Sequence, residues 1–433
     1  MKKVNICIAG LGNVGSEVVK HLTDNKDYYL KKTNIEFNIL AISAKNKSKK
    51  RVFDIDKFKW LDNPLDLIKI NDCNILIELI GTEKSISYEL VKKSLNNRIN
   101  VITANKALLS KHGDELFEIA DKNNTLLLFE AAVAGGIPII KVLKQSIFLN
   151  KIYKISGILN GTTNFILSEM EKKNLDFSQI LEDAQQKGYA ESDPTNDIEG
   201  IDSAHKLSLL SAICFGTKVN FDNIRYKGIS NIRIEDINYS NKLGYKIKLI
   251  SKSEIVNNKI SSLVEPILIN KNSQLANINS VLNAIKVETD HLESLFLIGE
   301  GAGGKATSSS VISDIFELAS DVKIPSLGYK NSELTNIEHI DYNDRNTSFY
   351  LRITVKDIPG VLAKITSNLN EEGISIETIL QMPENKINKN EVSIIITTHE
   401  TNSNLLNRSL IKIENLNFVV SKIAVITIDK TIN

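Results

Sequence analysis

The first third of the chain repeats one hydrophobic pattern. A short apolar run ends in glycine or a polar residue, and a segment with helical spacing or a polar loop follows. Such runs begin the stretches 4–10, 37–44, 74–81, 100–109 and 125–140, the last of which continues into a helix near Pro138. Strands that alternate with helices in this way form parallel sheets covered on both faces. The pattern therefore predicts a Rossmann-like, doubly wound α/β domain over residues 1–135.

The pattern changes after residue 135. Residues 151–170 predict a strand, a turn at 160–163 and a helix, and a second helix runs from Ile201 until Gly216 ends it. We expect an α+β domain with a mostly antiparallel sheet over 136–305 and a helix within 306–327 that returns to the first domain. Residues 328–347 are polar and Asn-rich, which is typical of a linker. Residues 348–433 predict strands and helices in the order βαββαβ.

A glycine-rich turn, GLGNVG, lies between the first strand and the first helix. This context favours a dinucleotide site, because Gly10 permits a tight turn, Gly12 lets the backbone approach a pyrophosphate and Gly15 lets helix and strand pack closely. The N-terminus of the helix supplies free N–H groups for the phosphates. The alternative is a glycine-rich turn without a ligand.

The end of the second strand bears on the choice of nucleotide. A site for NADH usually carries Asp or Glu there to hold the ribose hydroxyls. This strand runs instead into Ala44 and Lys45, followed by the basic residues Lys47, Lys49, Lys50 and Arg51. A basic cluster suits a 2′-phosphate, so the sequence favours NADPH over NADH. A solvated basic loop is the alternative.

Composition and charge exclude several classes of protein. The chain has 433 residues, 42% hydrophobic and 24% charged, which is typical of a soluble globular protein with about two or three domains. A formal net charge of +1 gives no electrostatic reason to expect nucleic acid or a membrane as partner. No apolar run approaches the roughly 20 residues that span a bilayer, and the N-terminal stretch reads as a strand and not a signal peptide. Cys7, Cys73 and Cys214 form neither a disulfide framework nor a metal motif, so we expect core cysteines in a reducing cytoplasm.

An acidic run precedes the helix that begins at Ile201. The stretch GYAESDPTNDIEGIDSAHKL holds five carboxylates, Glu191, Asp193, Asp197, Glu199 and Asp202, ahead of Lys206. Asp202 and Lys206 are four residues apart and therefore share one face of the helix. A solvated acidic loop with a surface salt bridge is the plain interpretation. A lysine flanked by a carboxylate in a closed site can instead exchange protons with a substrate.

Two further strand ends carry candidate chemistry. Ala104, Asn105 and Lys106 fall where a parallel strand opens onto the ligand crevice. Glu130 ends the next strand, beside a glycine-rich loop whose exposed carbonyl oxygens could hold a hard cation together with a carboxylate.

Six motifs occur in one order along residues 1–320: GLGNVG, TANKALL, FEAAVAGGIPI, LNGTTNFIL, GYAESDPTNDIEGIDSAHKL and GEGAGGKATSSSVISDI. Together they resemble homoserine dehydrogenase, a family that reduces aspartate 4-semialdehyde to homoserine with NAD(P)H on the route to threonine and methionine. The resemblance makes 136–305 a substrate-binding and dimerisation domain. DIPGVLAKI at 357–365 resembles the opening of an ACT domain, a module that commonly binds amino acids.

The resemblance also implies roles for matched residues. Lys206 corresponds to the proton donor, Lys106 to a lysine near cofactor and substrate, and Asp202, Glu191 and Asp197 to the carboxylates that hold the substrate. A monovalent cation, Na⁺ or K⁺, would be bound by Glu130 with the carbonyls of Val133, Gly135 and Ile137. The implied cofactor contacts are Gly10, Gly12, Asn13, Val14, Gly15, Ala44, Lys45, Thr82, Asn105, Lys106 and Gly303. Thr82 departs from the pattern, because many relatives have a second glycine after Gly81.

Partners and rivals follow from the same resemblance. It implies a homodimer or homotetramer, with L-threonine as a ligand of the ACT domain, although that domain could serve oligomerisation without a ligand. The rival functions are another amino-acid dehydrogenase with this fold and an amino-acid sensor with a degenerate catalytic half.

Overall fold

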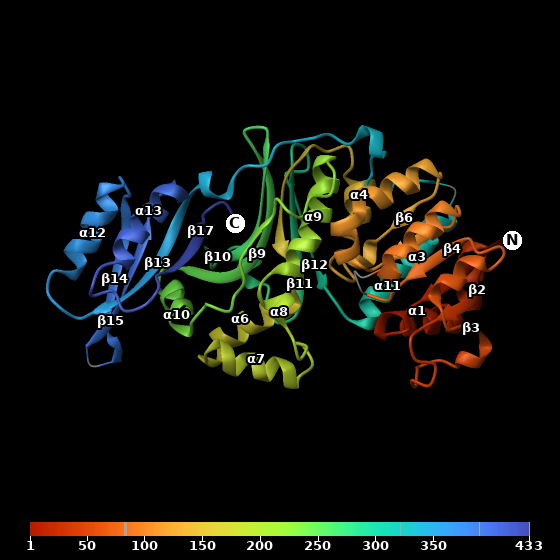
Figure 1. Cartoon of the computed structure of the whole chain (residues 1–433), viewed down its shortest axis with the longest axis horizontal. Coiled ribbons are helices and arrows are strands. Elements are labelled where there is room, and N and C mark those ends of the chain that lie inside the picture. The colour runs from red at the N-terminus through yellow and green to blue at the C-terminus, as the bar shows by residue number, and fades with distance from the viewer. Residues whose placement is uncertain (82–84, 321, 389, 433) are drawn as a thin grey trace.

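The computed structural model describes residues 1–81, 85–320, 322–388 and 390–432. The molecule is elongated, with the N-terminal part of the chain at one end and the segment after residue 348 at the other (Figure 1). Its strands form two sheets, one of six and one of eleven strands. No helix in the described part of the chain is long and apolar enough to cross a membrane.

The six-stranded sheet is parallel throughout. Alternate residues of its central strand enter different cores: Ile6 and Ile8 pack with two helices on one face, and Cys7 and Ala9 pack with two helices on the other. This is the doubly wound arrangement that the sequence predicts. In spatial order the strands are β3 (Lys59–Leu61), β2 (Ile35–Ser43), β1 (Lys2–Ala9), β4 (Ile75–Glu78), β5 (Asn100–Thr103) and β6 (Leu127–Leu128). The helices are α1 (Asn13–Asp24) and α11 (Gly304–Ala319) on the first face, α3 (Ser85–Asn96) and α4 (Lys106–Lys122) on the second, and α2 (Lys26–Thr33) before β2, with short 3₁₀ turns η1 (Ile55–Lys57) and η2 (Pro64–Lys69).

The last strand of this sheet is shorter than the hydrophobic run around residue 127 suggests. β6 has two residues, and a 3₁₀ turn, η3 (Glu130–Ala132), follows it. Long-range bonds replace the continuation of the ladder: Leu127 N–H donates to Ser326 Oγ at 3.0 Å and Glu130 N–H to Asp314 Oδ2 at 2.9 Å. The returning chain therefore closes this edge of the sheet.

The eleven-stranded sheet is mostly antiparallel, as expected. β10 pairs in parallel with β8 and with β17, and its remaining neighbour β9 is antiparallel. In spatial order the strands are β12 (Ser294–Glu300), β11 (Leu282–Thr289), β7 (Ile152–Ile158), β9 (Tyr245–Val256), β10 (Lys259–Asn270), β17 (Ala424–Asp429), β13 (Asn346–Lys356), β15 (Glu391–Thr398) and β14 (Ile376–Asn388), with β8 (Arg225–Tyr226) beside β10 and β16 (Thr401–Asn402) beside β13.

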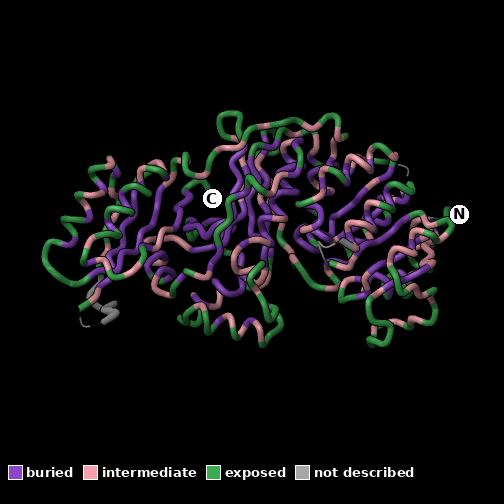
Figure 2. The backbone as a smooth tube through the Cα atoms, viewed as in Figure 1, coloured by how far each residue is buried: buried purple, intermediate pink, exposed green. Residues whose placement is uncertain are grey.

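One buried helix joins the two sheets. Helix α9 (Ile201–Phe215) packs against α4 on one side and against β7, β9 and β10 on the other, so nearly all of its residues are buried (Figure 2). The accompanying helices are α5 (Ile139–Lys141), continued by a π turn η4 (Val142–Ser146), α6 (Gly161–Lys173), α7 (Phe177–Gln186), α8 (Thr195–Ile198) and α10 (Ile234–Lys242), with η5 (Leu275–Asn277).

The prediction of a turn at 160–163 is wrong. Helix α6 already begins at Gly161, because the Asn160 side chain caps it by accepting from Thr163 N–H at 2.9 Å. The Asn-Gly pair that looks like turn chemistry is here an N-cap and the first helical residue.

The C-terminal module has the predicted order, β13, α12 (Val361–Glu371), β14, β15, α13 (Ser403–Glu414) and β17, with β16 as a short addition. Its sheet is continuous with that of the preceding domain through β10 and β17. A buried ion pair fixes the junction, with Arg352 Nε donating to Asp236 Oδ1 at 2.7 Å and Nη2 to Oδ2 at 3.1 Å. The polar linker is also docked: it contains η6 (Asn331–Glu333) and η7 (Tyr342–Asp344) and forms β-bridges with Thr217 and Ile260.

Candidate active site

The glycine-rich turn opens onto the first of two adjoining cavities. Three of its glycines are needed for different reasons. A Cβ on Gly10, whose φ is +95°, would lie 2.3 Å from the Leu79 backbone, and a Cβ on Gly15 would lie 2.0 Å from the Gly10 carbonyl oxygen. Nothing lies within 4 Å of the Cβ position at Gly12, which therefore faces open space for a ligand. This agrees with close approach of a pyrophosphate at Gly12.

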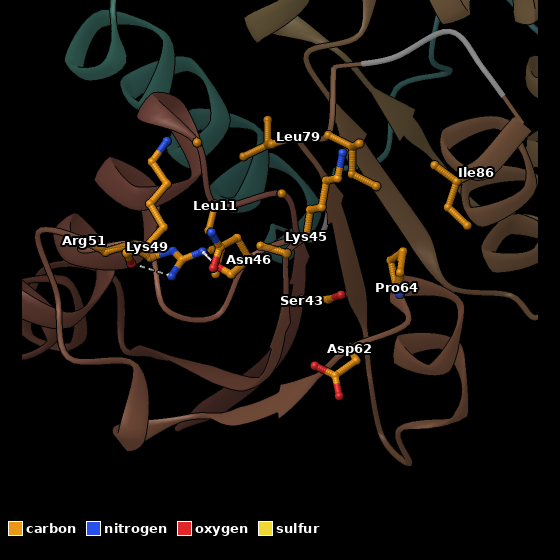
Figure 3. Close-up of a pocket in the computed structure, with 14 residues that line it drawn as sticks. Leu11, Ser43, Lys45, Asn46, Lys49, Arg51, Asp62, Pro64, Leu79 and Ile86 are labelled. Atoms are coloured by element: carbon orange, nitrogen blue, oxygen red, sulfur yellow. Dashed lines mark hydrogen bonds between the residues drawn. The ribbon is translucent and has the colours of Figure 1, made fainter.

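The main cavity has a volume of about 590 Å³ and lies at the carboxyl ends of the parallel strands (Figure 3). It is lined by Gly10, Leu11, Gly12, Ser43, Ala44, Lys45, Asn46, Lys49, Arg51, Asp62, Pro64, Leu79, Ile80 and Ile86. The Ser43 hydroxyl is buried and has no hydrogen-bond partner among the described residues. A ligand hydroxyl or ring nitrogen would satisfy it.

The basic loop after β2 is folded by its own arginine. Arg51 donates to the carbonyl oxygens of Asn46, Lys47 and Lys49 at 2.5, 3.2 and 2.8 Å and lies over the Trp60 ring at 5.3 Å. This arrangement holds Lys45 and Lys49 on the cavity wall. The one carboxylate on that wall, Asp62, accepts from Trp60 Nε1 at 2.8 Å.

The other predicted cofactor contacts are distributed around this region. Asn13 lines a second opening of about 530 Å³ together with Gly304, Lys305 and the basic loop. The Val14 side chain packs into the core, so only its backbone faces the turn. Gly303, with φ +110°, begins α11, and nothing lies within 4 Å of its Cβ position. Asn105 is buried and caps α4 by accepting from Leu108 N–H at 3.1 Å. Thr82 lies outside the described residues.

A buried carboxylate that the sequence analysis missed organises these strand ends. Glu78, at the end of β4, accepts from Thr103 Oγ1 at 2.6 Å, Ser87 Oγ at 3.1 Å and Ile80 N–H at 2.9 Å. The sequence does carry a signal for Glu78, because it stands at the end of an apolar run, as Lys106 stands shortly after the next one.

The second half of the site is a carboxylate between two lysines. Asp202 accepts from Lys206 Nζ at 2.7 Å through Oδ2 and lies 3.1 Å from Lys106 Nζ through Oδ1. Lys206 Nζ also donates to the Leu159 carbonyl oxygen at 2.6 Å. Asp202 and Lys206 are 8% and 7% exposed, so the surface salt bridge of the plain interpretation does not apply. The packing of α4 on α9 brings Lys106 to the pair.

One asparagine, which the sequence analysis treated only as turn chemistry, connects the carboxylates. Asn160 Nδ2 donates to Asp197 Oδ1 at 2.7 Å and to Asp202 Oδ2 at 2.9 Å, while its Oδ1 caps α6. Thr162 Oγ1 also lies 3.3 Å from Asp197 Oδ2. Both carboxylates are therefore supplied with donors and held in one orientation.

The remaining carboxylates of the acidic run differ in their roles. Glu191 is exposed at the rim, and its charge adds to that of Asp202 in raising the pKa of Lys106. Its backbone carbonyl oxygen accepts from Gln185 Nε2 at 3.0 Å. Asp193 folds back on its own turn, accepting from Thr195 Oγ1 at 2.6 Å. For Asp193 the solvated loop was the correct interpretation.

The charges of this cluster shift one another. Burial would raise the pKa of Asp202, but the ammonium groups of Lys206 and Lys106 outweigh it and hold that pKa below the ordinary value. The charge of Asp202 raises the pKa of Lys106. Burial, with the nearby charge of Asp202, raises the pKa of Asp197. The site thus holds an ionised carboxylate between the side chains of two lysines.

The loop after β6, where a cation is expected, holds Glu130 by backbone hydrogen bonds. The Glu130 carboxylate accepts from Ile140 N–H and Lys141 N–H, both at 2.8 Å, so it caps the start of α5. Burial raises the pKa of Glu130 to about 7, with the charge of Asp314 adding to the effect. Ala134 and Gly135 have φ +54° and +53°, and the Gly135 carbonyl oxygen accepts from Ser310 Oγ at 2.6 Å. Within the described ranges, no three His, Cys, Asp or Glu side chains gather as a metal site.

The fold and the two half-sites define the class of protein. A doubly wound domain with a glycine-rich turn faces a buried lysine–carboxylate pair on a second domain, which is the arrangement of an NAD(P)-dependent oxidoreductase. Protein-family models described as "Homoserine dehydrogenase, NAD binding domain", "Homoserine dehydrogenase" and "ACT domain" match residues 10–130, 138–316 and 349–415.

Individual relatives agree with this class. The homoserine dehydrogenase of Neisseria gonorrhoeae is 37% identical over 435 residues, which cover 99% of each chain. The crystal structure of a homoserine dehydrogenase from Thiobacillus denitrificans is similar with a TM-score of 0.91 and 36% identity, again over 99% of each chain. A hyperthermophilic archaeal homoserine dehydrogenase mutant in complex with NADPH has a TM-score of 0.62 and 26% identity, over 73% of this chain and 98% of its own. The chain belongs to the homoserine dehydrogenase family.

Proposed function

We propose that this protein interconverts L-aspartate 4-semialdehyde and L-homoserine, with NADPH as its preferred cofactor and Lys206 as the proton donor. The observation that carries the proposal is the bridge of Asp202 between Lys206 and Lys106, at 2.7 and 3.1 Å. The proposal is supported by the burial of Lys206 and by the packing of α9, which carries it, against α4 of the nucleotide domain.

We assign a separate role in the reaction to each of these residues. The cofactor, when bound, supplies the hydride. Lys206 donates a proton to the carbonyl oxygen of the semialdehyde, and Asp202 orients the Lys206 side chain. Asp197 and Glu191 bind the ammonium of the substrate, and Lys106 neutralises charge on the cofactor side. General acid catalysis of this kind contributes roughly 10²–10⁴-fold.

The preference for NADPH is supported by the wall of the main cavity. Lys45, Lys49 and Arg51 line it where the second ribose of a dinucleotide would lie, and the one carboxylate there is bonded to Trp60. The archaeal relative in complex with NADPH has a similar fold. The test is an absorbance assay of cofactor oxidation with aspartate semialdehyde and each cofactor in turn. We expect turnover with a higher kcat/KM for NADPH.

The same assay separates the rival functions. Turnover with another amino-acid precursor but none with aspartate semialdehyde would indicate a different dehydrogenase. Binding of an amino acid with no turnover of any substrate would indicate a sensor.

We also propose a monovalent cation, Na⁺ or K⁺, in the loop after β6. The ligands would be the Glu130 carboxylate and the carbonyl oxygens of Val133, Gly135 and Ile137, which suit a hard cation. Each Glu130 oxygen accepts one backbone N–H and keeps a further lone pair for the cation. The left-handed residues Ala134 and Gly135 turn the backbone of this loop sharply. Activity and unfolding temperature measured in NaCl, KCl and tetramethylammonium chloride at one ionic strength test it, and equal values in all three salts would contradict it.

The ACT domain supports a regulatory role. The turn at 357–360 precedes α12 and could receive the carboxylate of an amino acid at the helix N-terminus. We propose L-threonine as the ligand, in a homodimer or homotetramer in the cytoplasm. Calorimetric titration of the full chain with threonine tests the ligand, and light scattering tests the assembly. An absence of heat at millimolar threonine would favour a purely structural module.

A further inference from the structure

The strands β8 and β17 share one edge of β10, and antiparallel β9 occupies the other edge. On the shared edge β8 pairs with Leu263 and Val264, and β17, the last strand of the ACT domain, pairs with Ile267–Ile269. Both run parallel to β10, so they lie end to end along it. A shift of the ACT domain would therefore reach the segment at 225–229 directly.

Lys227 bonds across the gap between these two elements. Its backbone N–H donates to the Val264 carbonyl oxygen of β10 at 2.8 Å, and its Nζ donates to the Val425 carbonyl oxygen of β17 at 2.7 Å. The backbone bond would survive any substitution except proline. The bond to β17 depends on the lysine side chain alone.

The same segment supports the turn between Asp197 and Asp202, the carboxylates that we propose to hold the substrate. Ile229 N–H donates to the Ile198 carbonyl oxygen at 2.8 Å. A Cβ on Gly228 would lie 2.2 Å from that same oxygen, so the two backbones are in direct contact. Gly200, which ends the turn with φ +81°, packs against the Val264 side chain. The turn at 198–200 leads from Asp197 to Asp202.

We infer that Lys227 is a positioning residue that ties the last strand of the ACT domain to the turn between Asp197 and Asp202, so that the position of that domain sets the affinity for homoserine. The inference rests on the proposed role of these carboxylates in holding the substrate. It makes the segment 225–229 the link between regulatory and substrate domains.

The junction has a second, permanent contact with a different character. Asp236 and Arg352 are 0% and 2% exposed, so removal of either would leave a buried charge and unfold the region. Lys227 is exposed. Its bond can therefore break and form while the domains stay attached, which is what a coupling contact requires.

The experiment is a comparison of Lys227→Met with the wild-type full-length enzyme in the oxidation of homoserine by NADP⁺. We expect the KM for homoserine to rise about threefold to tenfold, a range typical of residues that couple two sites. The kcat and the KM for NADP⁺ should stay unchanged. Lys227→Arg keeps a donor of similar reach and should restore most of the affinity. Lys271→Met, at an exposed lysine that directly follows β10, is the matched control and should behave as wild type.

Two further variants separate this inference from the proposed function. Asp197→Asn should raise the KM for homoserine on its own; if it does not, the substrate role of the carboxylates fails, whatever Lys227 does. If Asp197→Asn raises the KM but Lys227→Met leaves it unchanged, the coupling alone is wrong. In the double variant the two effects should combine to less than their product, because Lys227 acts through the same turn. Effects that multiply fully would also overturn the inference.

Discussion

Replacement of Lys206 by methionine is the most direct test of the catalytic assignment. An ammonium has three N–H donors, and two of them are used within the protein, on the Leu159 carbonyl oxygen at 2.6 Å and on Asp202 at 2.7 Å. One donor remains for a substrate oxygen. Methionine keeps the length and the apolar stem of the side chain and removes the proton.

The expected magnitudes differ for catalysis and for folding. Loss of the proton donor should lower kcat by about 10²–10⁴-fold, which corresponds to about 3–5 kcal/mol on the barrier. Asp202 would keep Lys106 and the Asn160 amide as partners. The Leu159 carbonyl oxygen would lose the Lys206 donor, at a cost of about 1–3 kcal/mol in the free energy of unfolding. The fold should therefore persist while turnover fails.

The assay is steady-state oxidation of NADPH, together with NADPH binding by fluorescence and unfolding in urea. Lys206→Arg is an informative second variant, because a guanidinium keeps the charge and the donors but does not release its proton, so its kcat should also be low. Lys248→Met is the matched control: Lys248 is 2% exposed and donates to the Ile278 carbonyl oxygen and to Asn164, away from the site. It should lose stability and keep its kcat.

Three results would refute the reasoning. The first is a kcat above about a tenth of wild type in Lys206→Met, because an acid catalyst should account for a larger loss. The second is full activity in Lys206→Arg. The third is a loss of NADPH affinity as large as the loss of kcat. The second would assign Lys206 an electrostatic role without proton transfer.

Three more predictions concern the cofactor, acid stability and the ACT domain. Lys45→Ala should raise the KM for NADPH by about 10–100-fold, the worth of a charge-assisted bond, and leave the KM for NADH unchanged; equal changes in steady-state assays would contradict this. Burial would raise the pKa of Asp429, but Lys252 outweighs it and holds the pKa at about 2, so the ionised form stabilises the fold above pH 4 and this stability is lost as pH falls toward 2. Asp429→Asn should remove about 2 kcal/mol of that pH dependence in urea unfolding, and an unchanged slope would argue against it. A chain ending at residue 340 should aggregate, as light scattering would show, because it uncovers the β10 edge that pairs with β17; if a soluble short chain has no activity, the ACT domain is part of the catalytic machinery.

This last prediction corrects a simple division of labour between the domains. The polar, Asn-rich composition of 328–347 is typical of a linker. The structure shows a continuous sheet and a buried ion pair at the junction instead. In the present chain the exposed edge and the buried carboxylate make the two parts depend on each other.

Features that neighbouring residues specify can be predicted from the amino-acid sequence. The glycine-rich turn depends on backbone angles and close contacts within one strand–turn–helix unit, so its three glycines can be interpreted without knowledge of the rest of the fold. The pairing of Asp202 with Lys206 follows from the helical repeat alone. Alternation of apolar runs predicted the doubly wound sheet, because strands buried on both faces are continuously apolar.

Contacts between residues that are far apart in the chain are known only from the tertiary structure. Lys106 reaches Asp202 because α4 packs on α9, and nothing in the sequence around either residue specifies that contact. Asn160 was misread as turn chemistry because an N-cap and a turn use the same residue types. The sequence also does not show that Glu130 caps α5, because the N–H groups that it accepts from lie ten and eleven residues further along the chain. The partners of a strand edge, a helix terminus or a buried charge are set by packing between segments far apart in the chain, where local periodicity carries no information.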